Sequence, residues 1–265
     1  MLNADSNVRH ILRSRDVRLR IGYNVLISGI ALVAAFALAI NPDIFDRPLT
    51  GLINGFAGRS AFFDRLTFIL FTSPTFSGAV LVALVWSCWF DTTDPESRAH
   101  ILVGTLASLG AGVISRVLQY TLPTHPRPFY DSTLGFKLPA NLEQPLNTWN
   151  SFPSDHVTVF AGLVVVIYIA RSRFAFAAIA LTALTEFARV YMGAHYPSDL
   201  IGGAALASLV VWATETSWFT SLGSRIVGWQ RRSPSLFYMS AFFISYQIAT
   251  LAGDIRWAAS ILWHR

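Results

Sequence analysis

The chain contains several apolar runs of about the length that a helix needs to cross a membrane, and no other feature limits its fold as strongly. A spanning helix requires about 20 mostly apolar residues, and Ile21 to Ile40 provide them without a charge. Further runs follow at residues 76–90, 99–122, 156–170, 174–191 and 199–218, and a more polar candidate lies at 235–252. Only 13% of the residues are charged, against about 25% in soluble domains. We therefore predict an all-α polytopic membrane bundle of six transmembrane helices, with 235–252 as a candidate seventh.

The chain divides into three segments. Residues 1–20 form a basic N-terminal segment, 21–218 hold the membrane domain, and 219–265 form a C-terminal segment with the candidate seventh span. The first run is longer than the roughly 7–15 apolar residues of a cleaved signal peptide, which favours a retained anchor over that alternative. Between the first two runs, apolar side chains in residues 62–71 recur at helical spacing around Asp64 and Arg65. This pattern predicts an amphipathic helix lying in the interface at the outer face.

Arginine placement predicts the orientation of the bundle. Arginines are frequent before the first run, in the turn at 171–173 and in the stretch 225–232, whereas Lys137 is the only lysine. Basic segments tend to stay on the cytoplasmic side. The N-terminus is therefore expected in the cytoplasm, and segments 41–75, 123–155 and 192–198 are expected together on the outer face. We expect a bacterial inner-membrane protein whose site faces the periplasm.

The charge and the cysteine content limit the kinds of molecule and metal that the chain is expected to bind. The net charge of +5 does not predict nucleic-acid binding, because the arginines form no stripe interleaved with stacking aromatic residues. Membrane lipids are the expected surroundings, and the sequence indicates no protein partner. Cys88 is the only cysteine, so no disulfide can form within the chain and no Cys/His metal cluster is available. No metal or other cofactor is expected.

Three groups of polar residues fall at the predicted outer ends of the spans, and this convergence indicates a site. The groups are Arg127 with Pro128, the stretch 151–156, and Arg189 with His195 and Asp199. Ser154 or Asp155 occupies the N-cap position of an apolar helix, whose free N–H groups and dipole favour an anion. Arg127 and Arg189 offer planar forks that match phosphate oxygens. The arrangement predicts a phosphoryl group as ligand.

The histidines complete a set of groups for phosphoryl transfer. His195 and Asp199 are four residues apart at a predicted helix start, which brings their side chains within reach. A carboxylate on one imidazole nitrogen fixes the tautomer and leaves the other nitrogen free to attack. His156 lies in the first turn of the fourth run, where it can protonate a leaving oxygen. Each residue alone is more typical of a helix cap or an interface anchor than of a site, and only the joint spacing favours a site.

These residues resemble the type 2 phosphatidic acid phosphatase family, whose signature reads Lys-x6-Arg-Pro, Pro-Ser-Gly-His and Ser-Arg-x5-His-x3-Asp. The chain matches the second part as Pro153-Ser154-Asp155-His156 and the third as Ala188-Arg189, then His195 and Asp199 at the family spacing, while Arg127-Pro128 ends the first. The resemblance extends over roughly residues 45–215. It implies that His195 is the nucleophile, with Asp199 as its partner, and that His156 is the acid. It also implies that Arg127, Arg189 and Ser154 hold phosphate.

The chain departs from this signature at three positions. The family lysine falls at Tyr120, and we expect Arg116, one helical turn earlier, to replace it, with His125 as a second candidate. The serine of the third part is Ala188, which removes one hydroxyl. The glycine of the second part is Asp155, whose carboxylate either repels phosphate or caps the helix while only its N–H faces the anion; we favour the second.

Glu186 and Arg116 are charged residues within apolar runs, where a charge is costly unless it is paired. Glu186 precedes Arg189 by three residues, so the two can meet on one helix face. We favour a structural pair over a catalytic role for Glu186.

The most direct interpretation is a metal-independent membrane enzyme that removes phosphate from a lipid in two steps. His195 attacks phosphorus, His156 protonates the leaving oxygen, and water cleaves the phosphohistidine. A polyprenyl diphosphate or a phosphatidyl phosphate fits equally well. A lipid-linked phosphotransferase that uses the same site is an alternative, because an acceptor alcohol can replace water. A non-catalytic lipid-binding or transport protein is an alternative of another class, favoured only by the residues at 120 and 188.

Overall fold

The computed structural model describes residues 2–123, 126–139, 150–170 and 172–263, with backbone alone for 2–15, 260 and 263. Within these ranges, all regular secondary structure is helical. The elements are α1 (Leu2–Ala39), α2 (Asp46–Asn54), α3 (Ala61–Thr72), the π-helical η1 (Thr75–Ala79), α4 (Val80–Asp91), α5 (Pro95–Thr121), the 3-10 turn η2 (Pro128–Tyr130), α6 (Asp155–Ile169), α7 (Ala175–Tyr191), α8 (Pro197–Ala213), α9 (Ser217–Arg232), α10 (Pro234–Ala249) and α11 (Gly253–Trp263). The predicted all-α class is confirmed.

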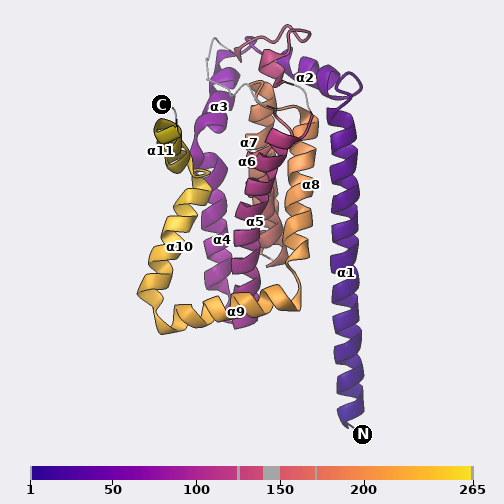
Figure 1. Cartoon of the computed structure of the whole chain (residues 1–265), viewed down its shortest axis with the longest axis vertical. Helices are drawn as coiled ribbons and strands as arrows, with labels where there is room; N and C mark the ends of the chain where they lie inside the picture. The colour runs from indigo at the N-terminus through magenta and orange to yellow at the C-terminus, as the bar shows by residue number, and fades with distance from the viewer. Residues whose placement is uncertain (1, 124–125, 140–149, 171, 264–265) are drawn as a thin grey trace.

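The bundle is built around α6 (Figure 1). Helices α4, α5, α7 and α8 all contact α6, and α1 lies against the outer side of α8. Phe160, Leu163 and Ile167 of α6 are fully buried, as expected of a helix that is apolar on every side. Helix α9 crosses one end of the bundle, α10 returns along its side, and α11 lies near the other end.

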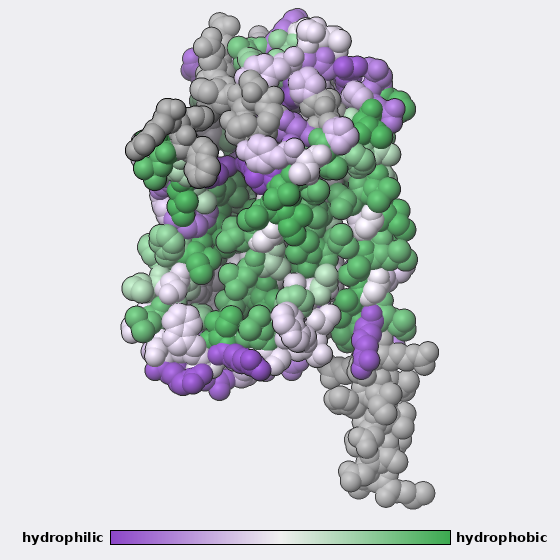
Figure 2. Space-filling view, viewed as in Figure 1, coloured by the Kyte–Doolittle hydropathy of each residue, from purple (hydrophilic) through white to green (hydrophobic). Residues whose placement is uncertain are grey.

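The outside of the bundle carries an apolar belt between two polar ends (Figure 2). Helices α1 and α5 are each long and apolar enough to cross a membrane alone. Three further pairs meet the same test only as bent pairs, namely α3 with η1–α4, α8 with α9, and α10 with α11. A belt of exposed large apolar side chains is stable where lipid, not water, is the solvent. The chain is an integral membrane protein.

Some predicted helix ends are wrong. The run at 199–218 ends as a helix at Ala213, and the chain then bends by 80° into α9, which contains Trp218. The polar stretch Thr214–Thr216 interrupts the helix, because Thr214 caps α8 and Thr216 stands before α9. The predicted amphipathic segment forms α3, which meets the next helix at a 66° bend after Ser73. A short helix α2, not predicted, precedes it.

Glycines let α5, α6 and α8 approach one another closely, at mid-helix between α5 and α6 and near the site between α6 and α8. A Cβ on Gly162 of α6 would lie 2.5 Å from Ser108 Oγ of α5, and one on Gly203 of α8 would lie 2.7 Å from the Ser154 carbonyl oxygen. Small residues at such contacts are typical of membrane helix packing. The Ser154 N–H also donates to the Asp199 carbonyl at 3.1 Å. The starts of α6 and α8 are therefore held side by side.

Candidate active site

The three segments predicted to share one face meet at one end of the bundle, uppermost in Figure 1. Asp131 joins them, because it accepts hydrogen bonds from Arg47 Nε at 2.8 Å and from the Tyr196 hydroxyl at 2.7 Å. Burial opposes ionisation of Asp131, but hydrogen bonds from Thr133, Arg47 and Tyr196 outweigh it and hold its pKa well below the usual range. The Asp131 carboxylate is therefore anionic at neutral pH. Through its hydrogen bond from Tyr196, it fixes the loop that carries His195.

A second carboxylate fixes the start of α8. Asp46 is fully buried, and it accepts the Ser198 N–H at 2.9 Å and the Ser198 hydroxyl at 2.5 Å. A carboxylate on the first free N–H groups of a helix stabilises the helix start. Sequence reasoning missed both Asp46 and Asp131, because their partners lie far away along the chain.

His195 lies in the loop between α7 and α8 and is only 2% exposed. Its Nδ1 is 3.4 Å from Asp199 Oδ2, and its Nε2 is 3.3 Å from Arg127 Nη1. A guanidinium only donates hydrogen bonds, so Nε2 accepts and the ring proton lies on Nδ1, toward Asp199. Burial, followed by the charge of Arg127, lowers the pKa of His195 well below its usual value. The imidazole is therefore neutral at pH 7, and its Nε2 lone pair faces Arg127.

Asp199 reaches His195 by a route that differs from the predicted one. Helix α8 begins at Pro197, so His195 precedes the helix instead of sharing a helical face with Asp199. Asp199 Oδ2 turns back and accepts the Tyr196 N–H at 2.8 Å, as one half of a capping box. The same oxygen thereby lies next to His195 Nδ1.

Two buried arginines, Arg127 and Arg189, lie near this imidazole. Arg127 Nη1 donates to the Ala194 carbonyl at 2.5 Å. Arg189 lies 3.1 Å from Glu186, as the spacing predicted, and stacks over Phe71 at 5.3 Å. Arg189 Nε is the atom that faces Glu186 in this ion pair, whereas Arg127 Nε is buried without a hydrogen-bond partner among the described residues. Because an unsatisfied buried donor costs about 1–3 kcal/mol, the Arg127 donor is typical of a site that binds an anion.

A second cluster of polar and charged side chains lies at the start of α6. Ser154 is the N-cap, and its Oγ accepts the Val157 N–H over a long 3.5 Å. Asp155 was expected to cap the helix, and this is wrong: its carboxylate forms a close ion pair with Arg116 and lies 3.1 Å from His156 Nδ1. The cap needs one side chain only and Ser154 provides it, which leaves Asp155 free to face the basic residues.

The structure places the remaining candidate residues from the sequence at different distances from this cluster. Arg116 reaches the cluster from α5, and Tyr120, at the family lysine position, is 64% exposed. Ala188 is fully buried. His125 lies outside the described residues. Arg256 of α11, which sequence reasoning did not single out, stands 3.9 Å from Asp155.

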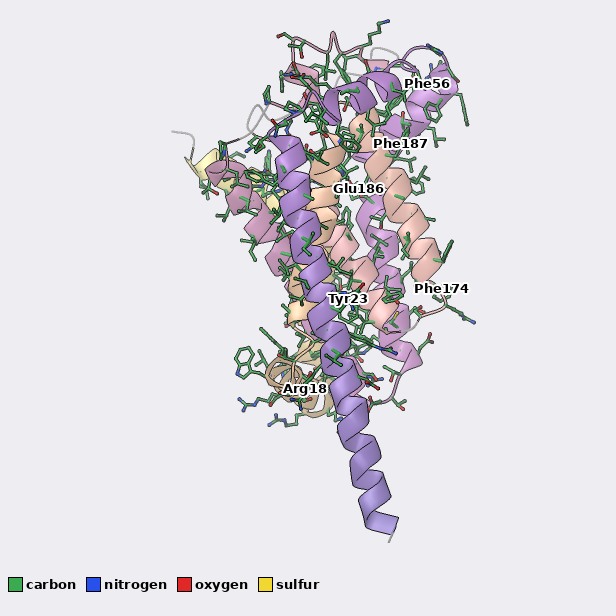
Figure 3. The ribbon with its side chains drawn as sticks, turned by 90° about the vertical axis from the view of Figure 1, so that its right-hand side faces the viewer. Arg18, Tyr23, Phe56, Phe174, Glu186 and Phe187 are labelled. Carbon is green, nitrogen blue, oxygen red and sulfur yellow. The ribbon has the colours of Figure 1, made fainter. Side chains whose placement is uncertain are left out.

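Glu186 belongs to the same end of the bundle. In Figure 3, Glu186 and Phe187 lie toward the end that carries Phe56, whereas Phe174, at the other end of the same helix, lies toward Arg18. Among the described residues, no group of three or more His, Cys, Asp or Glu side chains is arranged to hold a metal ion. The charged groups at this end are instead arginines paired with carboxylates.

A buried imidazole therefore lies among arginines at one end of a membrane bundle. The family model of the PAP2 superfamily matches one segment of the chain, residues 98–222. This segment contains every candidate residue from Arg116 to Asp199 and ends before α10 and α11. The chain is thus an integral membrane protein with a segment similar to the PAP2 superfamily.

Individual proteins show weaker similarity. The chain is 24% identical to undecaprenyl-diphosphatase BcrC of Bacillus subtilis (strain 168) over 158 residues, which are 60% of this chain and 76% of that protein. It is 25% identical to the bacitracin transport permease protein BcrC of Bacillus licheniformis over 118 residues, 44% of this chain and 55% of that protein. Among solved structures, the first transmembrane PAP2 type phosphatidylglycerolphosphate phosphatase from Bacillus subtilis matches 77% of this chain and 98% of that chain, with 16% identity and a TM-score of 0.46.

Proposed function

We propose that the chain hydrolyses a lipid diphosphate or lipid phosphate through a phosphohistidine on His195. One observation carries this proposal: the neutral imidazole points Nδ1 at the Asp199 carboxylate and Nε2 at the Arg127 guanidinium. An imidazole held in this way is a nucleophile whose attacking nitrogen already faces a phosphate-binding group.

In the first step, the phosphoryl group lies against Arg127, Arg189 and the first N–H groups of α6. His195 Nε2 forms the N–P bond while the P–O bond to the lipid breaks, and His156 gives its proton to the leaving oxygen when that oxygen needs one. Asp199 stabilises the positive charge that develops on the imidazole. In the second step, neutral His156 accepts a proton from water while the water oxygen attacks phosphorus; the N–P bond to His195 breaks and inorganic phosphate leaves. These groups perform both steps without a metal.

We further propose a polyprenyl diphosphate as substrate, because one relative is an undecaprenyl-diphosphatase. The orientation we propose places the N-terminus in the cytoplasm of a bacterium and the site at the periplasmic face of the inner membrane. Its support is the basic end of the bundle: Arg18 lies toward that end (Figure 3), and Arg231 and Arg232 occupy the last turn of α9. Basic segments favour the cytoplasmic side.

The test is phosphate release from a polyprenyl diphosphate by purified protein in detergent with a metal chelator present. We expect turnover by the wild type and a loss of at least about 10³-fold in His195→Ala, as for removal of a nucleophile. His100→Ala is the matched control, because His100 pairs with Glu215 at 2.9 Å away from the site. Alkaline quenching of a reaction with terminally labelled substrate should trap label on the protein. Equal turnover in His195→Ala and the wild type would exclude the nucleophile, and inhibition by the chelator would exclude metal independence.

A further inference from the structure

Arg256 reaches the site from a part of the chain that lies beyond residues 98–222, the segment that matches the PAP2 family model. Helices α10 and α11 follow residue 222 and are joined by a 78° bend. The end of α10 packs tightly on η1, because a Cβ on Gly78 would lie 2.3 Å from the Ala249 carbonyl oxygen. After the bend, the Tyr246 hydroxyl donates to Asp254 of α11. This packing directs α11 back over the bundle and brings Arg256 Nη1 to 3.9 Å from Asp155 Oδ2.

The Arg256 guanidinium is available for a ligand. At 3.9 Å it is too far from Asp155 for a hydrogen bond, and its side chain is 48% exposed. Asp155 already forms a close ion pair with Arg116, so one carboxylate faces two guanidinium groups. This corner of the site therefore keeps a positive charge that Asp155 does not neutralise.

The corner lies on the side of the leaving group in the proposed reaction. Asp155 contacts His156, the acid that faces the leaving oxygen, whereas Arg127 contacts His195, the nucleophile. In an in-line transfer the attacking and leaving groups are on opposite sides of phosphorus. A second anionic group attached through the leaving oxygen would thus meet Arg116 and Arg256.

We propose that Arg256, together with Arg116, forms a second anion subsite that binds the lipid-proximal phosphate of a lipid diphosphate. This proposal rests on the proposed function. When His195 takes the terminal phosphoryl group, the P–O bond to the bridging oxygen breaks and that oxygen stays on the lipid-proximal phosphate with one more negative charge. Both guanidinium groups stabilise that charge as it develops. A lipid monophosphate has no group at this position and gains nothing from the subsite.

The experiment compares kcat/KM for a prenyl diphosphate and a prenyl monophosphate of the same chain length. We expect Arg256→Gln to lower the ratio of the two values about tenfold, the effect of one charge-assisted contact. Arg256→Lys keeps the charge without the planar fork and should retain part of the ratio. Arg59→Gln is the matched control, because it removes an exposed guanidinium that stacks on Phe56 between α2 and α3, and its ratio should equal that of the wild type.

A ratio in Arg256→Gln within twofold of the wild-type ratio would overturn the subsite. So would an equal fall of the ratio in Arg59→Gln, because the effect would then belong to the general surface charge. Competition by inorganic pyrophosphate and inorganic phosphate provides a second measurement, in which Arg256→Gln should weaken inhibition by pyrophosphate more. Failure of the proposed function has a different signature, since His195→Ala would then turn over both lipids at wild-type rates.

Discussion

Replacement of Asp199 by asparagine tests whether its charge, and not only its hydrogen bonds, serves the reaction. Oδ2 is the atom that accepts the Tyr196 N–H at 2.8 Å and faces His195 Nδ1 at 3.4 Å. An asparagine with its oxygen at the Oδ2 position therefore preserves both contacts and the tautomer of His195. The substitution Asp199→Asn removes the negative charge and little else.

The size of the effect follows from the distance. A full unit charge on the imidazole, 3.4 Å from a carboxylate oxygen, interacts with it by about 5 kcal/mol at an effective dielectric constant of about 20. If about half of that charge has developed in the transition state, the carboxylate stabilises it by about 2.5 kcal/mol. At about 1.4 kcal/mol per factor of ten, we expect kcat to fall by roughly 60-fold.

The assay is steady-state phosphate release, with Asp46→Asn as the matched control. Asp46, the first residue of α2, is another buried carboxylate, and it accepts the Ser198 N–H and the Ser198 hydroxyl at the start of α8. We expect Asp46→Asn to lower the midpoint of thermal unfolding while kcat stays within about threefold of the wild type, because the effect of a removed helix-start contact is on stability. A kcat in Asp199→Asn within threefold of the wild type would refute the charge argument. Equal losses in both variants would assign the effect to the helix start.

Two further predictions concern the imidazoles. His156→Ala should lower kcat/KM by about 10²–10⁴ for a lipid phosphomonoester but far less for a lipid diphosphate, whose leaving phosphate has a pKa near 6 and needs no proton; equal losses on the two substrates would contradict the role of His156 as acid. The acidic limb of the kcat/KM profile for a lipid diphosphate should lie below about pH 6.5, because burial and Arg127 lower the pKa of His195 and only its neutral form attacks; an acidic limb at pH 7 or above would contradict this.

The helices could be predicted from the sequence because lipid-facing and buried residues are both apolar. The runs at 156–170 and 174–191 coincide with α6 and α7 to within a residue. The ends were harder to place where one apolar run contains two helices. Trp218 extends the apolar pattern beyond Ala213, yet the turn at Thr214–Thr216 assigns it to α9. Pro74 is a signal that was available for the bend between α3 and α4, because proline favours a helix start.

The site could be predicted where its residues are close in sequence. His195 and Asp199 are close in sequence, and so are Ser154 and His156. The members of each pair therefore stay close in space whenever a helix begins at that point of the chain. Arg256 is another matter: its distance from Asp155 depends on how α10 packs on η1, and no spacing in the sequence encodes that contact. The direction of the Asp155 side chain depended likewise on partners in α5 and α11.

His156 and His195 have different partners, and this difference explains how one can act as an acid and the other as a nucleophile beside the same negatively charged phosphate. An arriving phosphate makes both rings more basic, because nearby negative charge favours the protonated form. That change suits an acid and hinders a nucleophile. Arg127 Nη1 faces Nε2 of His195 at 3.3 Å and opposes a proton there. His156 instead presents Nδ1 to the Asp155 carboxylate at 3.1 Å, which can accept the Nδ1 proton. Pairs of groups whose surroundings differ in this way are typical of an acid and a base in one site.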